Sequence, residues 1–165
     1  MCTPRRSRGL TLIEIAVTLA VLAVLATLSV PSLASLASRH RLIGAAEELA
    51  LDLAEARFQA AQGGQALHLV FEPGPDWCYA VARGPGCGCQ AAQACQLKTV
   101  GAADLPGVTL VAAANASFDP AAVASVGGQA TWRSAHDGAQ LDVAMTALGR
   151  ARICSPTGVR GYPGC

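Results

Sequence analysis

The chain has 165 residues, enough for one membrane helix and one further domain of about 100–125 residues with its own hydrophobic core. Hydrophobic residues make up 52% of it, and twelve Lys and Arg face eleven Asp and Glu. Three of the basic residues lie within the first nine positions, so the remainder carries a net charge of −2. Because that remainder is not globally basic, bulk charge does not predict nucleic-acid binding.

A long apolar run follows the basic start of the chain. Residues 10–37 contain a single charged side chain, that of Glu14. As a helix the run would be about 42 Å long at ~1.5 Å per residue, longer than the ~30 Å hydrocarbon core of a membrane. A carboxylate at the centre of a bilayer costs about 3 kcal/mol or more, so we expect Glu14 to have a function and a cationic partner. Cleavage after Gly9 would provide that partner, the new amine of Leu10 in a neighbouring subunit.

The segment from Gly9 to Glu14, Gly-Leu-Thr-Leu-Ile-Glu, resembles the class III leader and N-terminal helix of type IV pilins and type II secretion pseudopilins. The resemblance implies that a prepilin peptidase removes leader residues 1–9 and that the new N-terminus, Leu10, is methylated. It also implies that Glu14 guides subunit assembly. Pro31 stands where these proteins often have a helix-kinking proline. Leu10 departs from the family pattern, in which phenylalanine is usual.

Two other interpretations of the N-terminal segment are open. An ordinary secretory signal has an apolar core of about 7–15 residues and a small-x-small cleavage site, which residues 35–37 would supply. The mature chain would then begin at Ser38. The second alternative is a plain signal-anchor helix. Both leave Gly9 and Glu14 unexplained, and the apolar run is too long for a secretory signal.

Residues 38–63 continue the helix with an amphipathic pattern. One face is apolar at helical spacing and consists of Leu42, Ala46, Leu49, Leu53, Ala56 and Ala60. The other side is largely acidic, and we expect it to be a solvated face made of Glu47, Glu48, Asp52, Glu55 and Gln59. Gly63 and Gly64 supply a stop signal for the helix. The apolar face needs a surface to pack against.

From residue 64 onward the hydrophobic period changes to two, which is typical of β-strands. Strands are expected at 67–71, 77–81, 108–112, 129–133, 141–145 and 150–154. The first two would form a hairpin, and residues 84–96 are predicted to be a loop. The predicted fold class is therefore α+β. A long N-terminal helix with a membrane half (10–37) and an amphipathic half (38–63) packs on an antiparallel β domain (64–165).

Six cysteines remain once the leader and its Cys2 are removed: Cys78, Cys87, Cys89, Cys95, Cys154 and Cys165. An even number beyond a membrane anchor indicates disulfides in an oxidising periplasm. Six cysteines allow 15 pairings, and the sequence alone does not choose among them. The spacings within residues 78–95 do not match the paired knuckles of zinc sites, so disulfides are favoured. Cys87 and Cys89 are not expected to bond to each other, because one intervening residue strains the geometry.

The C-terminal segment is the one candidate interaction site. Residues 149–165 contain three arginines and no acid. Arg150 and Arg152 would project from one face of the expected strand 150–154, since alternate residues of a strand point to opposite faces; Arg160 lies nearby in sequence. The simplest interpretation is an edge strand protected by charge.

A narrower resemblance implies a role for this segment. The chain resembles the GspH/FimT family of minor pilins and pseudopilins in its Trp77-Cys78 strand, its Cys87-Gly88-Cys89 loop and its Gly149-Arg150-Ala151-Arg152-Ile153-Cys154 strand with a final Cys165. In some members that resemble FimT, the Gly-Arg-x-Arg strand binds DNA during natural transformation. The resemblance thus implies DNA binding by Arg150 and Arg152, with Arg160 beside them. It also favours a disulfide between Cys154 and Cys165, whose separation is easily bridged.

No residues in the sequence support an enzyme, a metal site or a cofactor site. The three histidines lack metal-ligand spacing, and no phosphate-binding loop or nucleophile motif is present. The resemblance implies a minor pilin or pseudopilin, a single-pass protein of the bacterial inner membrane with a periplasmic C-terminal domain. Its partners would be a prepilin peptidase and the other pilins of a type II secretion pseudopilus or a type IV pilus. The alternative is a DNA-binding minor pilin that acts in DNA uptake.

Overall fold

The structure is a computed structural model that describes residues 11–121, 126–146 and 148–165, and their side chains except those of residues 27–33 and 126. The chain divides into two compact units, Met1–Leu36 and Ala37–Cys165, each of which is described by itself. A single helix, α1 (Leu12–Gly63), contributes to both units and ends at the glycine pair predicted to stop it. Gly64 has a φ of 63°, the left-handed conformation typical of a residue that follows a helix.

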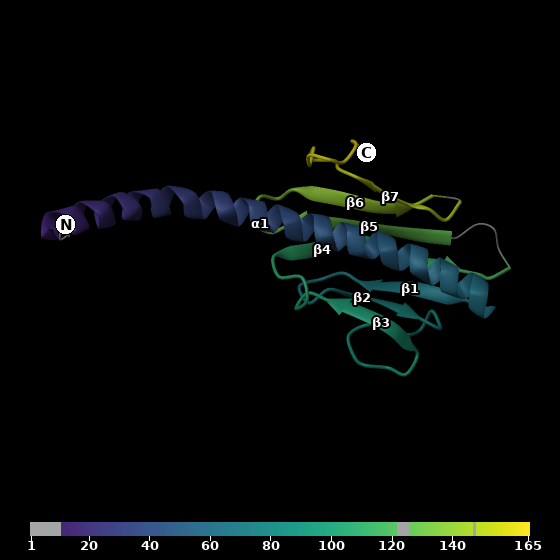
Figure 1. Cartoon of the computed structure of the whole chain (residues 1–165). Coiled ribbons are helices and arrows are strands. Elements are labelled where there is room, and N and C mark those ends of the chain that lie inside the picture. The colour runs from purple at the N-terminus through teal and green to yellow at the C-terminus, as the bar shows by residue number, and fades with distance from the viewer. Residues whose placement is uncertain (1–10, 122–125, 147) are drawn as a thin grey trace, which may run out of the picture. The chain divides into compact units, whose positions relative to one another are not determined.

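The second unit is built on one antiparallel sheet (Figure 1). Its seven strands in the described residues are β1 (Leu67–Glu72), β2 (Cys78–Ala82), β3 (Gln96–Gly101), β4 (Val108–Phe118), β5 (Val126–Ser134), β6 (Gln140–Met145) and β7 (Ala151–Cys154). Their order across the sheet is β3-β2-β1-β4-β5-β6-β7, and every neighbouring pair is antiparallel. The two edges are therefore β3 and β7.

Helix α1 covers one face of this sheet (Figure 1). All six residues of the predicted apolar helix face are at most 1% exposed. They pack in one cluster with aromatic residues of the sheet, in which the rings of Trp77 and Trp132 meet edge-on at a centroid distance of 4.8 Å. The indole Nε1 of Trp77 donates to the Val108 carbonyl at 2.9 Å, so this buried polar atom is satisfied. The α+β fold predicted from the sequence is confirmed.

The structure adds one strand that the sequence pattern did not indicate. Residues 96–101 form β3, directly after the predicted loop, although only Val100 among them is buried. The residue that alternation would make apolar is Lys98, which lies opposite the buried Val81 on the face toward α1. An inward-pointing charge is one way in which natural sheets protect an edge strand. Here the charged residue interrupts the alternation of apolar and polar residues by which the sequence would reveal the strand. Strand β4 is also longer than predicted, since it extends to Phe118.

The expectation that the acidic side of the helix is fully solvated is wrong for part of that side. The Lys98 ammonium donates to Glu48 Oε1 and to Asp52 Oδ1, both at 2.8 Å. The phenol of Tyr79 donates to the second oxygen of Asp52, also at 2.8 Å. Two acids of α1 therefore fix the helix on the β2–β3 end of the sheet, next to the apolar core.

This polar cluster shifts the titration of its members. Burial, followed by the charge and hydrogen bond of Asp52, raises the pKa of Tyr79 far above its ordinary value of 10.0. Burial alone would lower the pKa of Lys98, but its bonds to Asp52 and Glu48 outweigh this and raise it above 10.5. Both protons are thus held more tightly in the folded state than in the unfolded state.

We therefore expect alkaline destabilisation of the Ala37–Cys165 unit. The stability from these groups is complete well below pH 10, and it is lost as pH rises through the ordinary pKa values of the two groups, because the unfolded state releases their protons first. Tyr79→Phe should lower the free energy of unfolding at pH 7 by about 1–2 kcal/mol and flatten its decline between pH 9.5 and 11. Thermal unfolding across that range, followed by circular dichroism, measures both effects. An unchanged alkaline slope in Tyr79→Phe would contradict this account.

Candidate functional site

The first helical turn is the first candidate site. Thr11 caps α1, because its carbonyl accepts from the amides of Glu14 (3.1 Å) and Ile15 (3.2 Å), and its hydroxyl also accepts from the Glu14 amide at 3.3 Å. This is half of a capping box, Thr-x-x-Glu. The carboxylate of Glu14 thus lies in the first turn, where the helix dipole favours a negative charge. Gly9 and Leu10, the predicted cleavage and methylation residues, lie outside the described residues.

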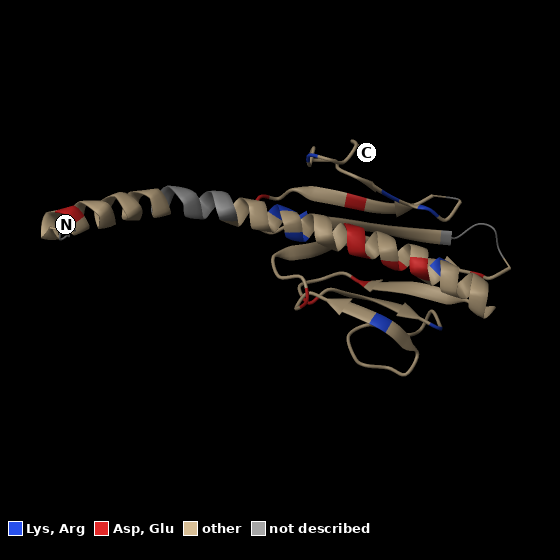
Figure 2. Cartoon of the chain, viewed as in Figure 1, with Lys and Arg blue, Asp and Glu red and all other residues tan. Residues whose placement is uncertain are grey.

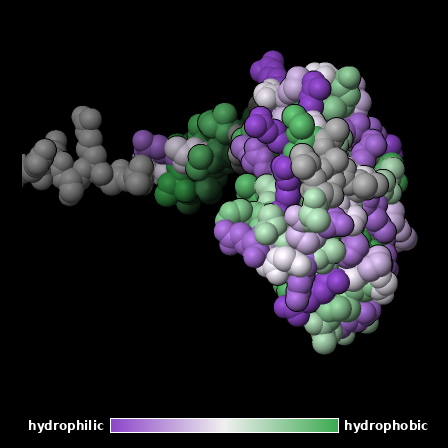
Figure 3. Space-filling model, turned by 90° about the vertical axis from the view of Figure 1, so that its right-hand side faces the viewer, coloured by the Kyte–Doolittle hydropathy of each residue, from purple (hydrophilic) through white to green (hydrophobic). Residues whose placement is uncertain are grey.

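The rest of this unit exposes apolar side chains. Large hydrophobic residues at least 47% exposed in the first turns of α1 are Leu12, Ile13, Ile15, Val17, Leu19, Val21, Leu22, Val24 and Leu25. In Figure 3 the described surface of this unit is mostly green. Such a surface requires lipid or other apolar helices around it. Within the described residues, no helical stretch has both the length and the mean hydropathy of a membrane span, and the predicted membrane half, 10–37, stays a prediction.

Pro31 lies within α1, which continues past it to Gly63. Its side chain lies outside the described residues, and the kink predicted there stays a prediction. A proline inside a helix removes one amide donor.

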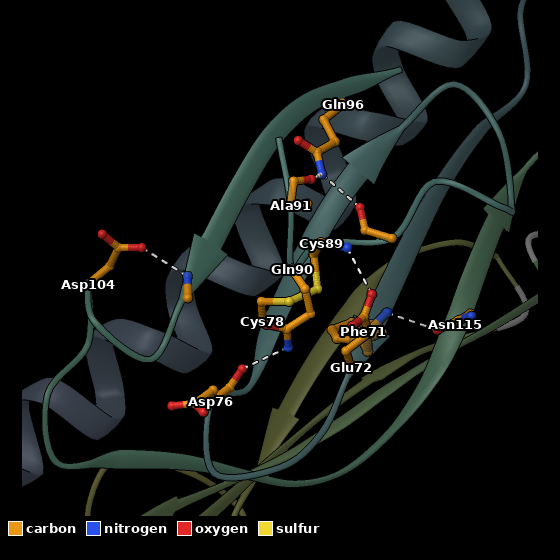
Figure 4. Close-up of a disulfide and its surroundings, with 12 residues drawn as sticks. Phe71, Glu72, Asp76, Cys78, Cys89, Gln90, Ala91, Gln96, Asp104 and Asn115 are labelled. Atoms are coloured by element: carbon orange, nitrogen blue, oxygen red, sulfur yellow. Dashed lines mark hydrogen bonds between the residues drawn. A yellow bond between two sulfur atoms is a disulfide. The ribbon is translucent and has the colours of Figure 1, made fainter. Parts of the chain in front are cut away.

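The Cys78–Cys95 region forms two interlocked disulfides, Cys78–Cys89, which Figure 4 shows, and Cys87–Cys95. They fold the loop after β2 over the sheet face opposite α1, where Cys78, Ala80 and Cys89 form a second small buried cluster. The Glu72 carboxylate accepts from the Cys89 amide at 2.9 Å and anchors the loop to β1. This arrangement explains why β2 is buried at every position.

Two groups in the described residues have ligand atoms close enough for a metal ion, Glu72–Cys78–Cys89 and Asp142–Cys154–Cys165. In each group the two sulfurs are joined in a disulfide. Metal ligation by cysteine requires thiolates, so neither group offers a cysteine ligand set in this state.

The third disulfide joins Cys154 to Cys165, the pair favoured from the sequence. It closes a C-terminal loop for which the chain-entropy estimate gives about 2–3 kcal/mol. The loop has its own anchors: buried Ser155 donates through its hydroxyl to the Gln140 carbonyl and accepts from the Val159 amide. The phenol of Tyr162 donates to Glu47 of α1 at 2.7 Å. Burial and then this bond raise the pKa of Tyr162 to about 12.

The predicted basic segment lies at the sheet edge formed by β7 (Figure 2). Arg152 is within the strand and Arg150 directly precedes it, and both are exposed, whereas Ala151 and Ile153 are partly buried toward the core. Arg160 is exposed on the C-terminal loop. The edge position agrees with the simplest interpretation of the sequence, an edge strand protected by charge.

A groove of about 560 Å³ separates α1 from β7. It is lined by Glu47, Ala50, Leu51, Ala54 and Arg57 of the helix and by Gly149, Arg150, Ala151 and Ile153 at the edge. Leu51 is 69% exposed, since it lies on the side of the helix away from buried Leu49 and Leu53. The sequence did not indicate this groove, because it depends on the distance between two elements about a hundred positions apart.

Gly149 sets the end of the groove. Its φ is 70°, a left-handed conformation that favours glycine. The Arg57 guanidinium donates to its carbonyl at 3.1 Å, and a Cβ on Gly149 would lie 2.8 Å from Arg57 Cζ. The glycine of the Gly-Arg-x-Arg motif therefore lets the strand turn and lets an arginine of α1 approach it.

Known proteins show two similarities to this chain. Residues 4–30 match the prokaryotic N-terminal methylation motif. The type IV minor pilin FimU of Pseudomonas aeruginosa PAO1, in its P21 crystal form, has a TM-score of 0.51 at 19% identity, over 75% of this chain and 96% of that one. Its P65 crystal form gives 0.48 at 19% identity, over 73% and 98%. No curated protein matches the sequence.

At this level of identity the likeness to FimU shows the fold alone. The chain thus combines a prokaryotic N-terminal methylation motif with a fold like that of a type IV minor pilin.

The contact of Arg57 with Gly149 gives a test of the local geometry. Gly149→Ala should cost about 1–2 kcal/mol for the left-handed conformation and about 1 kcal/mol more for the displaced Arg57 hydrogen bond. Gly158→Ala is the matched control, because Gly158 has a φ of 76° and no atom within 4 Å of an added Cβ. Urea unfolding of both variants, with and without Arg57→Ala, measures the difference. Equal losses in the two glycine variants would contradict a role for Arg57.

Proposed function

We propose that this chain is a minor pilin or pseudopilin of the GspH/FimT type, a structural subunit of a type IV pilus or a type II secretion pseudopilus. It is made as an inner-membrane precursor with a leader of residues 1–9. The helical segment 10–37 anchors it in the membrane, segment 38–63 extends that helix, and residues 64–165 form the periplasmic domain. After cleavage between Gly9 and Leu10 and methylation of Leu10, the subunit packs into a filament through α1.

The observation that carries this proposal is the surface of the first turns of α1. Apolar side chains are exposed all around the helix there, and the only charge among residues 11–37 is Glu14 in the first turn. Such a segment is stable among lipids or other apolar helices. A carboxylate in that environment needs a cation, and the amine of a cleaved neighbour, at Leu10, supplies one. The methylation motif at residues 4–30 supports the same reading.

The partners follow from this assembly. A prepilin peptidase processes the chain, and other pilins or pseudopilins surround it in the filament. FimU is a type IV minor pilin, but its likeness to this chain concerns the fold, which does not choose between a pilus and a secretion pseudopilus. The neighbouring genes distinguish these machines, because secretion genes and pilus-assembly genes cluster separately.

Replacement of Glu14 tests the assembly role. Glu14→Ala should leave membrane insertion and cleavage intact, because it removes a charge from the anchor. It should reduce incorporation into filaments at least about tenfold, if the ion pair contributes about 1.4 kcal/mol or more to assembly. Intact mass of the membrane form should show a chain that starts at Leu10 in both proteins. Immunoblots of sheared filaments measure incorporation.

Two comparisons make this experiment decisive. Glu14→Gln keeps the shape without the charge and should fail like Glu14→Ala, whereas Glu55→Ala removes an exposed acid of α1 outside the anchor and should assemble normally. Normal assembly of Glu14→Ala would refute the proposed ion pair. A mature chain that starts at Ser38 would refute the pilin-type processing.

DNA binding is the second candidate function. The observation that favours it is the exposure of Arg150, Arg152 and Arg160 on one edge of the domain, in a segment that contains no acid. Three guanidinium groups contact only a few phosphates, so binding would be weak and independent of sequence. On a pilus, such a subunit would bring DNA to the cell for uptake.

A titration of duplex DNA into the Ala37–Cys165 unit tests this candidate. All buried core residues of the unit lie between Leu42 and Val159, so the fragment retains its whole described core. Arg150→Ala with Arg152→Ala should abolish binding without unfolding, because both side chains are exposed. Raising the salt from 50 to 200 mM should weaken binding of the unchanged domain by about tenfold for any sequence. Fluorescence anisotropy measures each affinity, and absent binding at low salt rejects the candidate.

A further inference from the structure

Strand β7 has an open backbone edge whose direction can be worked out. It pairs with β6 in the register Ala144↔Arg152, and one step beyond the ladder the Thr146 amide donates to the Arg150 carbonyl at 2.9 Å. Because hydrogen-bonded and non-hydrogen-bonded pairs alternate in an antiparallel ladder, Arg152 also directs its backbone groups toward β6. The N–H and C=O groups of Ala151 and Ile153 therefore point away from β6, toward the open edge.

The next residue in the same series supports this assignment. The amide of Ser155 also points outward, and it donates to the Pro163 carbonyl of the C-terminal loop at 2.8 Å. The loop thus covers the edge from Ser155 onward. Within the described residues, the outward backbone groups of Ala151 and Ile153 make no hydrogen bond, which leaves two donors and two acceptors in a row. An exposed row of this kind is a template for an added strand.

The groove lies directly beside this open row. The side chains of Ala151 and Ile153 form one of its walls, and Ala50, Leu51 and Ala54 of α1 form the other. An added strand would send every second side chain into this groove, since alternate residues point to opposite faces. These five wall residues are apolar, while the charged residues Glu47, Arg57 and Arg150 also line the groove. A volume of about 560 Å³ is enough for two side chains of valine or leucine size.

The side chain between those two would lie on the other face, directly opposite Arg152. In that position a strand added antiparallel to β7 forms a non-hydrogen-bonded pair with Arg152, the pair type with the closest side chains. The Arg152 guanidinium is exposed and has no ion-pair partner among the described side chains. An acidic residue of the partner would complement it, and Arg150 adds a second positive charge at the same end.

We propose that β7 and the groove beside it bind an extended segment of a partner protein by strand addition, and that this segment has an apolar–acidic–apolar pattern. The apolar residues face Ala151 and Ile153 and fill the groove, and the acidic residue pairs with Arg152. This site lies in the globular unit and uses none of the residues of the anchor, so it provides a contact beyond the helix packing of the proposed filament.

The first test uses the full chain in nanodiscs of zwitterionic lipid and a short fluorescein-labelled peptide with valine–aspartate–valine at its centre. Arg152→Glu should weaken binding of this peptide at least about fivefold and strengthen binding of a valine–lysine–valine peptide, because like charges directly opposite each other repel. Arg160→Glu makes the same charge change on the exposed C-terminal loop and should change neither affinity more than about twofold. Anisotropy measures all affinities.

The second test separates strand addition from attraction of charge and leaves the protein unchanged. In the proposed pairing the valine amides face β7 and the aspartate amide faces away. Methylation of both valine nitrogens should therefore abolish binding, whereas methylation of the aspartate nitrogen should be tolerated. Absent binding of the unmodified peptide, equal effects of Arg152→Glu and Arg160→Glu, or indifference to valine methylation would each overturn the proposal. If the valine-methylated peptide still binds and duplex DNA displaces it, the site binds anions in general and does not add a strand.

Discussion

Burial of one face of α1 against the sheet is the interaction on which the rest of the Ala37–Cys165 unit depends. The helix supplies Leu42, Leu49 and Leu53 at 0–1% exposure, and the sheet supplies Trp77 and Trp132 at the same depth. Each fully buried side chain of this size contributes about 1.5–3 kcal/mol. One helix packs mainly on the central strands of this seven-stranded sheet. The edge strands β3 and β7 therefore need further protection of their backbone groups.

The two edges are protected in different ways. At β3, Lys98 points inward and binds two acids of α1, and the disulfide loop covers the far face of the neighbouring strand β2. At β7, the C-terminal loop returns over the edge and is held by Cys154–Cys165 and by the Ser155–Pro163 hydrogen bond. That cover ends before Ile153. The exposed arginines beside the uncovered part of β7 protect this edge against pairing with other chains, and their positive charge favours a partner with acidic residues.

The sequence predicts those features that depend on local periodicity. The helix, its apolar face and its end at Gly63 follow from spacing and a stop signal, and most strands follow from alternation. Strand β3 was missed because Lys98 takes the place of an apolar residue, and its partners, Glu48 and Asp52, are about fifty positions away. The groove and the pairing of the four cysteines in residues 78–95 likewise depend on distances between elements. No local pattern encodes such distances.

The same reasoning explains why the two candidate sites differ in how well the sequence reveals them. Glu14 lies within a helix that carries no other charge over residues 11–37, so its isolation is visible in the sequence itself. Its cap on Thr11 also involves residues only three positions apart. The β7 edge becomes visible only when α1 and β7 are placed side by side, because neither Leu51 nor Ile153 is unusual alone. An arginine pair on a strand has several meanings, and the open backbone and the apolar wall beside it are what favour a polypeptide partner there.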